Sequence, residues 1–358
     1  MEDVSLLRLY GYTDALELAR VKSNLLMFDV ARVVSEHKER YIIITKNGFC
    51  EAEITGNLRF TANSRGDFPA VGDWVAVTLY DDDKALIQAI FPRYSVLKRE
   101  AVGEVANEQI LAANVDYGWL IQSVDRDFNL NRLERYLSIC YEAGVSPIIV
   151  LTKVDLLHFS LRVDIVNQIT QRIKGVSVYE ISNVTKDGFQ KLISSLEKSK
   201  TYALLGSSGV GKSTLINNLL GYQQFATKKL SASTHKGRHT TTHREMVLLD
   251  NGSVLIDNPG MREIGVADAQ SGIHTTFASI LRLAEGCKFV DCTHTSEVGC
   301  KVIEAINNGD VSQDAYVNYL KMIREQTYFD ASVAERRKRD RDFGKFLKQY
   351  KNKYGKNH

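Results

Sequence analysis

The stretch from Gly206 to Thr214 constrains the fold more than any other part of the chain. It reads Gly-Ser-Ser-Gly-Val-Gly-Lys-Ser-Thr, so it matches the pattern G-x-x-x-x-G-K-[ST]. It follows the apolar run 202–205 and begins a helical pattern that continues to Leu220. Glycines let backbone N–H groups surround phosphates, Lys212 can reach phosphate oxygens, and Ser213 can ligate Mg²⁺. A strand, a phosphate loop and a helix in this order predict an α/β nucleotide-binding domain.

The residues around this loop alternate between two hydrophobic patterns. Strand-like and helical runs occur in turn at 117–121, 131–142, 147–151, 202–205, 212–220 and 254–256. Such alternation predicts a parallel sheet covered by helices on both faces. All nine loop residues are expected to contact the nucleotide: Gly206, Ser207, Ser208, Gly209, Val210, Gly211, Lys212, Ser213 and Thr214.

A carboxylate follows the run 147–151, in the sequence Thr152-Lys153-Val154-Asp155. There Asp155 can accept hydrogen bonds from both N1–H and N2–H₂ of guanine, whereas adenine has an acceptor at N1 and no N2 amine. A carboxylate that loses its donors rejects the wrong base. Lys153 can lay its stem over the base. These residues therefore predict guanine specificity.

The tetrapeptide resembles the base-reading motif of the GTPase superfamily, usually Asn-Lys-x-Asp. Thr152 replaces the usual Asn, so we expect one link between this loop and the phosphate loop to be weaker. Ser182 and Asn183 occupy the place of the second guanine loop, usually Ser-Ala, whose backbone N–H groups would meet the guanine O6. The alternative for these two residues is an ordinary exit from a strand.

Two further segments complete the resemblance around the phosphates. Asp257-Asn258-Pro259-Gly260 resembles Asp-x-x-Gly, whose aspartate holds the Mg²⁺ shell and whose glycine N–H meets the γ-phosphate. Upstream lies the segment 237–243, where a threonine can close on Mg²⁺ when the γ-phosphate is present. By its motif position that threonine is Thr241, with Thr240 and Thr242 as alternatives.

The order of these motifs is unusual. Ordinary GTPases carry the phosphate loop first and the base-reading motif late, whereas here Asp155 precedes Lys212. The same site can form if the domain is circularly permuted, because the positions of the strands place the loops. The segment after Asp257 then runs directly into the C-terminal part of the chain. We therefore expect a change at the γ-phosphate to reach that part.

The first hundred residues show a different pattern. Residues 1–25 read as a short amphipathic lead, and residues 28–97 contain short β-type runs, such as 41–45 and 73–77. Turn signals separate these runs. Several short strands within so few residues predict a small barrel of the OB type, and an SH3-like barrel is the alternative.

Four metal-binding side chains lie close together in the spacing C-x₄-C-x-H-x₅-C, namely Cys287, Cys292, His294 and Cys300. Three thiolates and an imidazole make a closed tetrahedral zinc site of the structural kind. Thiolate ligands argue against Mg²⁺ or Ca²⁺. We therefore expect one structural zinc ion per chain. The remaining cysteines, Cys50 and Cys140, lie in apolar patterns and are expected in the core.

Charge is distributed unevenly along the chain. The net charge is +3, but residues 331–358 hold ten Lys or Arg and three Asp or Glu, so this segment carries +7 and the rest carries −4. Its aromatic and leucine side chains follow a helical spacing, at Phe343, Phe346, Leu347, Tyr350 and Tyr354. A basic helix favours a polyanionic partner, and the alternative is a solvated helix docked on the body.

A β-barrel, a permuted GTPase and a Cys/His module, over roughly residues 28–350, are similar to the bacterial ribosome small-subunit-dependent GTPase A family. The resemblance implies a Mg²⁺-dependent GTP hydrolase that acts late in the maturation of the small (30S) ribosomal subunit. It also implies an enzyme that binds 16S rRNA through its OB and zinc domains and is stimulated by the subunit.

The same resemblance assigns the catalytic group. Many GTPases place Gln directly after Asp-x-x-Gly to orient the attacking water, and here that position is Met261. We therefore expect unassisted turnover on the order of 10⁻³ s⁻¹ or below. The resemblance points to His239 as the replacement. Arg238 is the alternative, as an arginine finger supplied in cis. The third possibility is that Arg238 and His239 both contact only RNA.

The expected fold is multidomain. Residues 1–97 form the lead and an OB-type β-barrel, 98–272 a circularly permuted α/β P-loop GTPase domain, and 273–358 an α-helical zinc-binding domain with a basic C-terminal helix. An rRNA-binding assembly factor that uses GTP mainly as an affinity switch is the alternative function. An ATP-dependent kinase or motor is a third, against which Asp155 argues.

Composition argues against a membrane span, a secretory leader and a disulfide framework. No run approaches about 18 apolar residues, and no basic region followed by an apolar run opens the sequence. Five cysteines are too few for a disulfide framework in 358 residues. We therefore expect a cytoplasmic protein that binds no membrane. With the motifs and the resemblance above, we expect a monomer that binds GTP or GDP.

Overall fold

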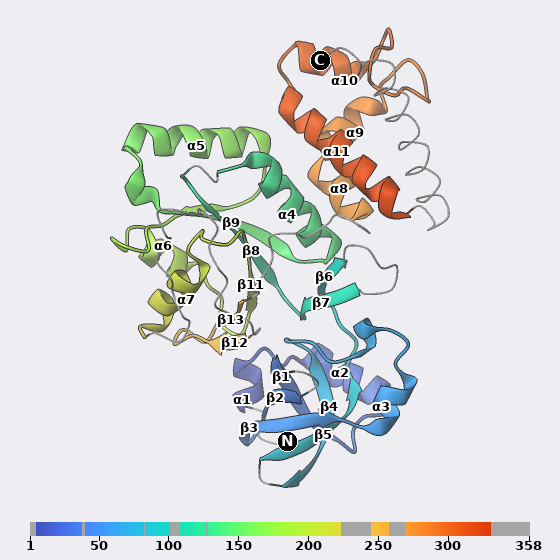
Figure 1. Cartoon of the computed structure of the whole chain (residues 1–358), viewed down its shortest axis with the longest axis vertical. Helices are drawn as coiled ribbons and strands as arrows, with labels where there is room; N and C mark the ends of the chain where they lie inside the picture. Colours follow the sequence, from blue (N-terminus) through green and yellow to red (C-terminus); the bar gives the residue numbers. More distant parts are fainter. Residues whose placement is uncertain are drawn as a thin grey trace, which may run out of the picture.

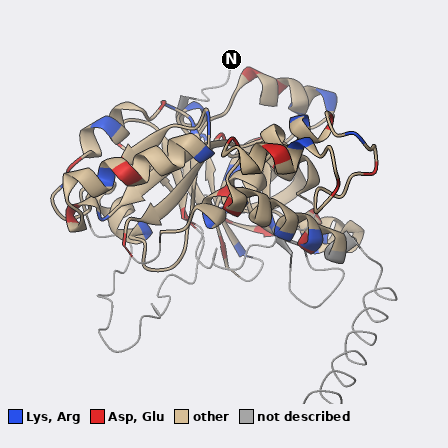
Figure 2. Ribbon diagram, turned by 90° about the horizontal axis from the view of Figure 1, so that it is seen from above, with Lys and Arg blue, Asp and Glu red and all other residues tan. Residues whose placement is uncertain are grey.

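In the computed structural model, the barrel, the central sheet and the C-terminal helices follow one another along the long axis of the molecule (Figure 1). The structure describes residues 5–37, 40–81, 83–100, 108–125, 128–222, 245–257 and 269–330. Within these ranges, no helix has the length and apolar character needed to cross a membrane. Figure 2 shows basic and acidic residues interspersed along the described helices. The basic segment 331–358 and its expected helix lie outside the described residues.

The N-terminal part is a closed barrel of five strands. Its strands are β1 (Asp29–His37), β2 (Arg40–Thr45), β3 (Gly48–Ile54), β4 (Trp74–Asp81) and β5 (Lys84–Ile90). β1 pairs with both β2 and β4, and β3 pairs in parallel with β5, so the sheet closes on itself in the order 1-2-3-5-4. Ile43, Val75 and Ile87 fill the interior with no solvent exposure. The prediction of an OB-type barrel is confirmed.

Short elements surround the barrel. They are α1 (Ser5–Leu9), α2 (Asp14–Lys22), α3 (Gly56–Thr61), the 3₁₀ turn η1 (Arg65–Asp67), and the hairpin β6 (Val96–Glu100) with β7 (Glu108–Ala113). The Thr13 side chain caps α2 by accepting a hydrogen bond from the Leu16 N–H at 3.3 Å. Leu7 and Leu16 are buried, so the amphipathic lead packs its apolar face against the protein.

Among the described residues, the central sheet has six strands in the order β10-β9-β8-β11-β13-β12. Their bounds are β8 (Tyr117–Ser123), β9 (Ser146–Thr152), β10 (Val178–Glu180), β11 (Thr201–Leu205), β12 (Glu245–Leu248) and β13 (Val254–Asp257). All neighbours run parallel except the pair β12–β13. Leu120 faces one hydrophobic core, and Trp119 and Ile121 face the other, because strand side chains alternate.

Helices cover both faces of this sheet, as the alternating patterns predict. The helices here are α4 (Leu130–Glu142), α5 (Phe159–Arg172), α6 (Phe189–Ser194) and α7 (Lys212–Leu220). Buried side chains of α4 and α5, such as Leu137 and Ile169, belong to one core, and those of α6 and α7, such as Leu192 and Leu215, to the other. Cys140 on α4 and Cys50 on β3 are both buried, as expected.

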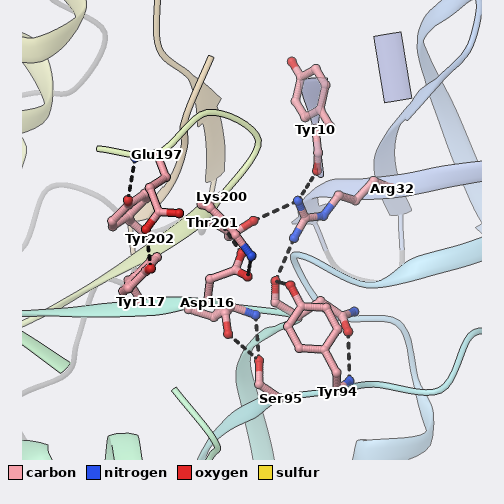
Figure 3. A network of polar contacts seen from close by, with 12 residues as sticks. Tyr10, Arg32, Tyr94, Ser95, Asp116, Tyr117, Glu197, Lys200, Thr201 and Tyr202 are labelled. Atoms are coloured by element: carbon pink, nitrogen blue, oxygen red, sulfur yellow. Dashed lines mark hydrogen bonds and ion pairs between the residues drawn. The ribbon is translucent and has the colours of Figure 1, made fainter. Parts of the chain in front are cut away.

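One register pair, Ser35 with Glu245, joins β1 to β12, so barrel and central sheet form one continuous hydrogen-bonded sheet. Three residues before Ser35 on β1 is Arg32, which is 1% exposed and lies among polar partners from several elements (Figure 3). Its guanidinium donates to the Thr201 hydroxyl on β11 at 2.9 Å and to the Tyr10 carbonyl.

Two more carbonyls accept from the same guanidinium, those of Gly72 at 3.2 Å and Asn114 at 2.9 Å. The group also lies over the Trp74 ring, 5.1 Å from its centroid. Burial lowers the pKa of Arg32. The side chain thus connects the lead, the barrel, the segment after β7 and the first residue of β11.

The C-terminal helices are α8 (Gln270–Thr276), α9 (Ala278–Ala284), α10 (Lys301–Asn307) and α11 (Gln313–Asp330). Helices α8 and α11 contact α4, and α9 contacts α8 and α10. Gly272 of α8 lies so close to α4 that a Cβ there would be 1.9 Å from the Ser138 carbonyl oxygen, so only glycine fits. The Gly272 N–H donates to the Glu142 carboxylate at 2.8 Å, and the Ser138 hydroxyl donates to that of Thr276 at 2.9 Å.

The expected domain boundaries fall inside secondary-structure elements. The boundary between residues 97 and 98 lies within β6, and that between 272 and 273 lies within α8. A single cluster of buried apolar side chains extends from Trp74 in the barrel through Leu137 to Met322 on α11. The three parts therefore share a core, and the division into 1–97, 98–272 and 273–358 stays a prediction.

Candidate nucleotide and metal sites

The phosphate loop connects the carboxyl end of β11 to the first turn of α7. Gly211 precedes the helix with φ +98°, and a Cβ there would lie 2.7 Å from Nδ2 of Asn183, so this position requires glycine. Helix α7 directs its first backbone N–H groups toward the loop, as a phosphate site needs. Ser213 and Thr214 lie in the first turn of this helix. The predicted strand, loop and helix are present in that order.

Two charged residues lie at the phosphate loop, Lys212 at the start of α7 and Asp257 at the end of β13. β11 and β13 are parallel neighbours, with Leu204 opposite Asp257, so the loop and this aspartate share one sheet edge. The Lys212 ammonium donates to the carbonyls of Gly206 at 2.7 Å and Ser207 at 2.9 Å. Burial lowers the pKa of Lys212 to about 8, and the nearby Asp257 carboxylate opposes that shift.

Asp257 fits a bound cation. The residue is 2% exposed, and its Oδ1 atom has no hydrogen-bond partner among the described residues. Burial raises the pKa of Asp257, although Lys212 opposes the shift. A buried carboxylate oxygen without a donor is costly unless a cation or a proton satisfies it. With the Ser213 hydroxyl on the adjoining helix, this oxygen supplies the hard donors that Mg²⁺ prefers.

The two expected guanine loops lie side by side. Asp155 follows β9 in the 3₁₀ turn η2 (Val154–Leu156), and its carboxylate accepts a hydrogen bond from the buried Ser182 hydroxyl at 2.5 Å. Ser182 Oγ in turn accepts from the backbone N–H groups of Val184 and Thr185. Asp155 itself is exposed, so one of its oxygens can meet a base.

Lys153 stands between strand and turn in the left-handed conformation, with φ +61°. Its ammonium pairs with the Asp125 carboxylate, which follows β8, at 2.8 Å. This ion pair fixes the end of the side chain, so the stem that is expected to cover the base is held at both ends.

Thr152 links the two loops. Its buried hydroxyl donates to the Val210 carbonyl at 2.6 Å, so a link is present without the usual Asn, and its expected weakness relative to Asn stays a prediction. Asn183 makes a second link, because its Nδ2 donates to the Gly211 carbonyl at 3.1 Å. Asn218 on α7 donates to the Asn183 carbonyl at 3.0 Å. Two base-loop residues therefore share the task of holding the phosphate loop.

Several predicted residues lie outside the described part of the chain. They are Arg238, His239, the candidate threonines Thr240, Thr241 and Thr242, and Gly260 with Met261. The structure therefore describes the strand that ends at Asp257 and leaves the assignments in the neighbouring loops as predictions.

The four predicted metal ligands come together at the C-terminal helices. Cys287, Cys292, His294 and Cys300 place one ligand atom each within 4.8 Å of the other three, so they could hold a metal ion. Nδ1 of His294 lies 3.5 Å from Sγ of Cys287 and 3.4 Å from that of Cys300. Three sulfurs and one imidazole nitrogen at these separations suit a tetrahedral site.

Neighbouring residues hold the ligand loop in place. The Glu297 carboxylate accepts from the backbone N–H groups of Thr293 at 2.9 Å and Ser296 at 3.0 Å. The Tyr316 hydroxyl on α11 donates to the His294 carbonyl at 2.8 Å. Cys300 also caps α10, since its Sγ accepts from the Ile303 N–H at 3.4 Å. The cluster is thus connected to both α10 and α11.

Known proteins match this architecture over nearly the whole chain. The RsgA GTPase family model matches residues 90–267. The small ribosomal subunit biogenesis GTPase RsgA 2 of Lactiplantibacillus plantarum is 41% identical over 96% of this chain and 97% of its own length. The chain belongs to the RsgA GTPase family. RsgA 1 of Bacteroides thetaiotaomicron is 37% identical, with 96% of each chain covered.

Solved structures agree on the RsgA fold. YjeQ from Thermotoga maritima has a TM-score of 0.60 at 23% identity, with 84% of this chain and 98% of its own covered. YloQ, described as a circularly permuted GTPase, has the same score and identity, with 86% and 97% covered. The predicted permutation is therefore confirmed. An ABC transporter model also matches residues 189–354, a range that contains the phosphate loop common to many nucleotide hydrolases.

Proposed function

We propose that this RsgA-family GTPase acts in the late maturation of the small (30S) ribosomal subunit, binds its 16S rRNA and hydrolyses GTP faster when bound to the subunit. The observation that carries the proposal is the likeness, over nearly the whole chain, to relatives named small ribosomal subunit biogenesis GTPases. The joined phosphate and guanine loops support it, because they provide a binding edge for GTP.

Binding of GTP follows from the residues at the carboxyl edge of the central sheet. Asp155 accepts from the guanine, Ser182 orients its carboxylate, and Lys212 exchanges its carbonyl partners for phosphate oxygens. Fixing the nucleotide at both ends holds the γ-phosphate in one place for attack. The proposed contacts are Thr152, Lys153, Val154, Asp155, Ser182, Asn183, Gly260 and the nine phosphate-loop residues Gly206 to Thr214.

Ser213, Asp257 and Thr241 are the proposed magnesium ligands. Bound Mg²⁺ neutralises charge that develops on the transferred phosphoryl group. His239 accepts a hydrogen bond from the attacking water, because Met261 cannot orient it, and Arg238 is the rival residue. Basal turnover is slow because Met261 stands where many GTPases place the water-orienting Gln, and the subunit is proposed to bring His239 to the attacking water.

The Cys287, Cys292, His294 and Cys300 cluster binds one structural zinc ion in this proposal. Its thiolate-rich ligand set favours zinc, and all four positions are taken by protein, so no position is open for substrate. The zinc holds the loop that follows α9 against α10 and α11. This module, the OB-type barrel and the basic segment 331–358 contact rRNA, with the enzyme working as a cytoplasmic monomer.

Turnover of GTP with and without purified small subunits tests the proposal, and ATP serves as the control nucleotide. We expect slow turnover alone, strong stimulation by the subunit and no ATP hydrolysis. Turnover that the subunit leaves unchanged contradicts the proposed partner, and equal ATP hydrolysis contradicts the role of Asp155. His239→Ala should abolish stimulation while GTP still binds, and Arg238→Ala is the matched control that separates the two candidates.

A further inference from the structure

Helix α4 contacts the phosphate loop at one end and the C-terminal helices along its length. Arg132, in its first turn, donates from Nη1 to the Ser207 hydroxyl at 2.9 Å. Ser207 is 6% exposed, and its carbonyl accepts from the Lys212 ammonium at 2.9 Å. Arg132, Ser207 and Lys212 therefore form a continuous chain of hydrogen bonds from α4 to the lysine that meets the phosphates.

The start of α4 is fixed in the central sheet. Gln122 on β8 is buried and makes two hydrogen bonds with the backbone of Asn129. Its Nε2 donates to the Asn129 carbonyl at 2.9 Å, and its Oε1 accepts from the Asn129 N–H at 2.8 Å. The Asn129 side chain caps α4 by accepting from the Arg132 N–H at 3.0 Å. The backbone of Arg132 thus has a defined position beside the phosphate loop.

The next residues of α4 contact the C-terminal helix α11. Glu134 is 3% exposed and accepts from Nδ2 of Asn318 at 2.6 Å. The same Nδ2 donates to the Asn131 carbonyl at 3.3 Å, directly beside Arg132. Arg135 pairs with Glu325 through two hydrogen bonds, at 2.7 and 2.6 Å. Residues 131, 134 and 135 thus present one helix face to α11.

We infer that Arg132 is a positioning residue for GTP, which orients Ser207 and through it Lys212, and that the seating of α11 on α4 sets this orientation. The inference rests on the proposed use of the phosphate loop for GTP. It adds a contact route between the zinc-bearing module and the nucleotide that does not pass through the segment after Asp257. A partner that shifts the module therefore changes GTP affinity through α4.

The test is the equilibrium affinity of the full-length, zinc-loaded chain for a fluorescent, non-hydrolysable GTP analogue. We expect Arg132→Ala and Ser207→Ala each to weaken affinity at least about tenfold, the effect of one lost charge-assisted hydrogen bond. The double variant should bind no more weakly than Arg132→Ala, because both changes remove the same contact. Arg132→Lys retains a donor and should recover part of the loss. Arg40→Ala, an exposed arginine on the barrel, controls for the loss of one positive charge.

The link to α11 is tested by Asn318→Ala with Glu325→Ala. The pair should weaken GTP affinity about twofold in the wild-type chain and have no effect in the Arg132→Ala background. Variants that merely misfold would lower the bound fraction at saturation and leave the affinity of the folded molecules unchanged.

Three outcomes overturn the inference while GTP binding by the wild type keeps the proposed function intact. In the first, Arg132→Ala binds the analogue as tightly as the wild type. In the second, the double variant loses the product of the two single losses in affinity. In the third, the changes at Asn318 and Glu325 weaken affinity equally in the wild-type and Arg132→Ala backgrounds. Failure of the wild-type chain to bind the analogue contradicts the proposed function itself, and the inference with it.

Discussion

The central GTPase domain is joined to its two neighbours by chemically different contacts. On the barrel side, Arg32 is enclosed completely and donates only to neutral oxygens in its described hydrogen bonds. On the C-terminal side, Arg135 and Glu325 form an ion pair whose side chains are 21% and 24% exposed. A buried cation whose hydrogen bonds go only to neutral oxygens depends on every acceptor around it, whereas a partly exposed ion pair is screened by salt.

This difference indicates different mechanical roles. The barrel shares a hydrogen-bonded sheet with the central domain, and Arg32 contacts Thr201, the first residue of the strand that leads to the phosphate loop. Among the described residues, the printed hydrogen bonds between the C-terminal helices and α4 each involve at least one side chain, and apolar packing adds to them. We therefore expect the barrel to move with the central sheet and the C-terminal module to shift on α4 more readily.

Removal of zinc should have the largest effect, because it should unfold part of the C-terminal module and leave the barrel and central sheet folded. A structural zinc site supplies the folding free energy of its module, so chelation should unfold the ligand loop at 287–300. Hydrogen exchange is the measurement: amide protection should vanish there and persist in the barrel and central sheet. Unchanged protection of the loop after verified metal loss contradicts the assignment of a zinc site.

Arg32→Met should cost about 4 kcal/mol of unfolding free energy, because it leaves buried acceptors without a donor. Urea unfolding measures this cost, and Arg40→Met on the exposed face of β2 is the control. A loss below about 1 kcal/mol would mean that water satisfies these acceptors, and the barrel junction would then be no more rigid than the other.

Glu134→Ala should cost about 3 kcal/mol, since it leaves Arg172 buried without its carboxylate partner. The two residues form an ion pair at 2.6 Å, in which the Arg172 side chain is 9% exposed and the Glu134 side chain 4% exposed. Arg172→Ala should cost a similar amount in the same unfolding experiment. If the double variant loses as much unfolding free energy as the two single variants together, the two side chains have no coupling energy.

Arg135→Ala should have the smallest effect, about 0.5 to 1 kcal/mol, which high salt should reduce further. The measurement is urea unfolding at low and at about 1 M salt, with Glu325→Ala as the matching variant. The Arg32→Met loss should not change with salt. Equal salt dependence of the two variants would remove the distinction between the junctions.

The nucleotide site could be predicted largely from the sequence, because each part of it is a short segment. The strand before Gly206, the helix after Gly211 and the turn at Asp155 all depend on local pattern, and the structure has all three. Thr152 shows the limit of such reasoning. Comparison with the usual Asn predicts a weaker link but does not identify its partner, the Val210 carbonyl, which only the folded loops bring to the Thr152 hydroxyl.

Other features had little or no signal in the sequence. Arg32 interrupts an apolar run in β1, and a charge at such a place indicates a buried partner without naming it. Arg132 resembles any polar residue in the first turn of a helix. Gly272 gives no indication that α8 approaches α4 closely, and the helix α5 lacks a strong apolar periodicity that would have revealed it.

The sequence by itself determined the phosphate loop, the base-reading carboxylate, the Cys/His cluster and the permuted order, because each is a spacing within a few residues or an order of segments. Only the tertiary structure decided which distant residues meet. Arg32 and Thr201 are 169 positions apart, and Arg135 and Glu325 are 190 apart. No local pattern encodes such pairs, since they form only when the barrel, sheet and helices have packed around their shared core.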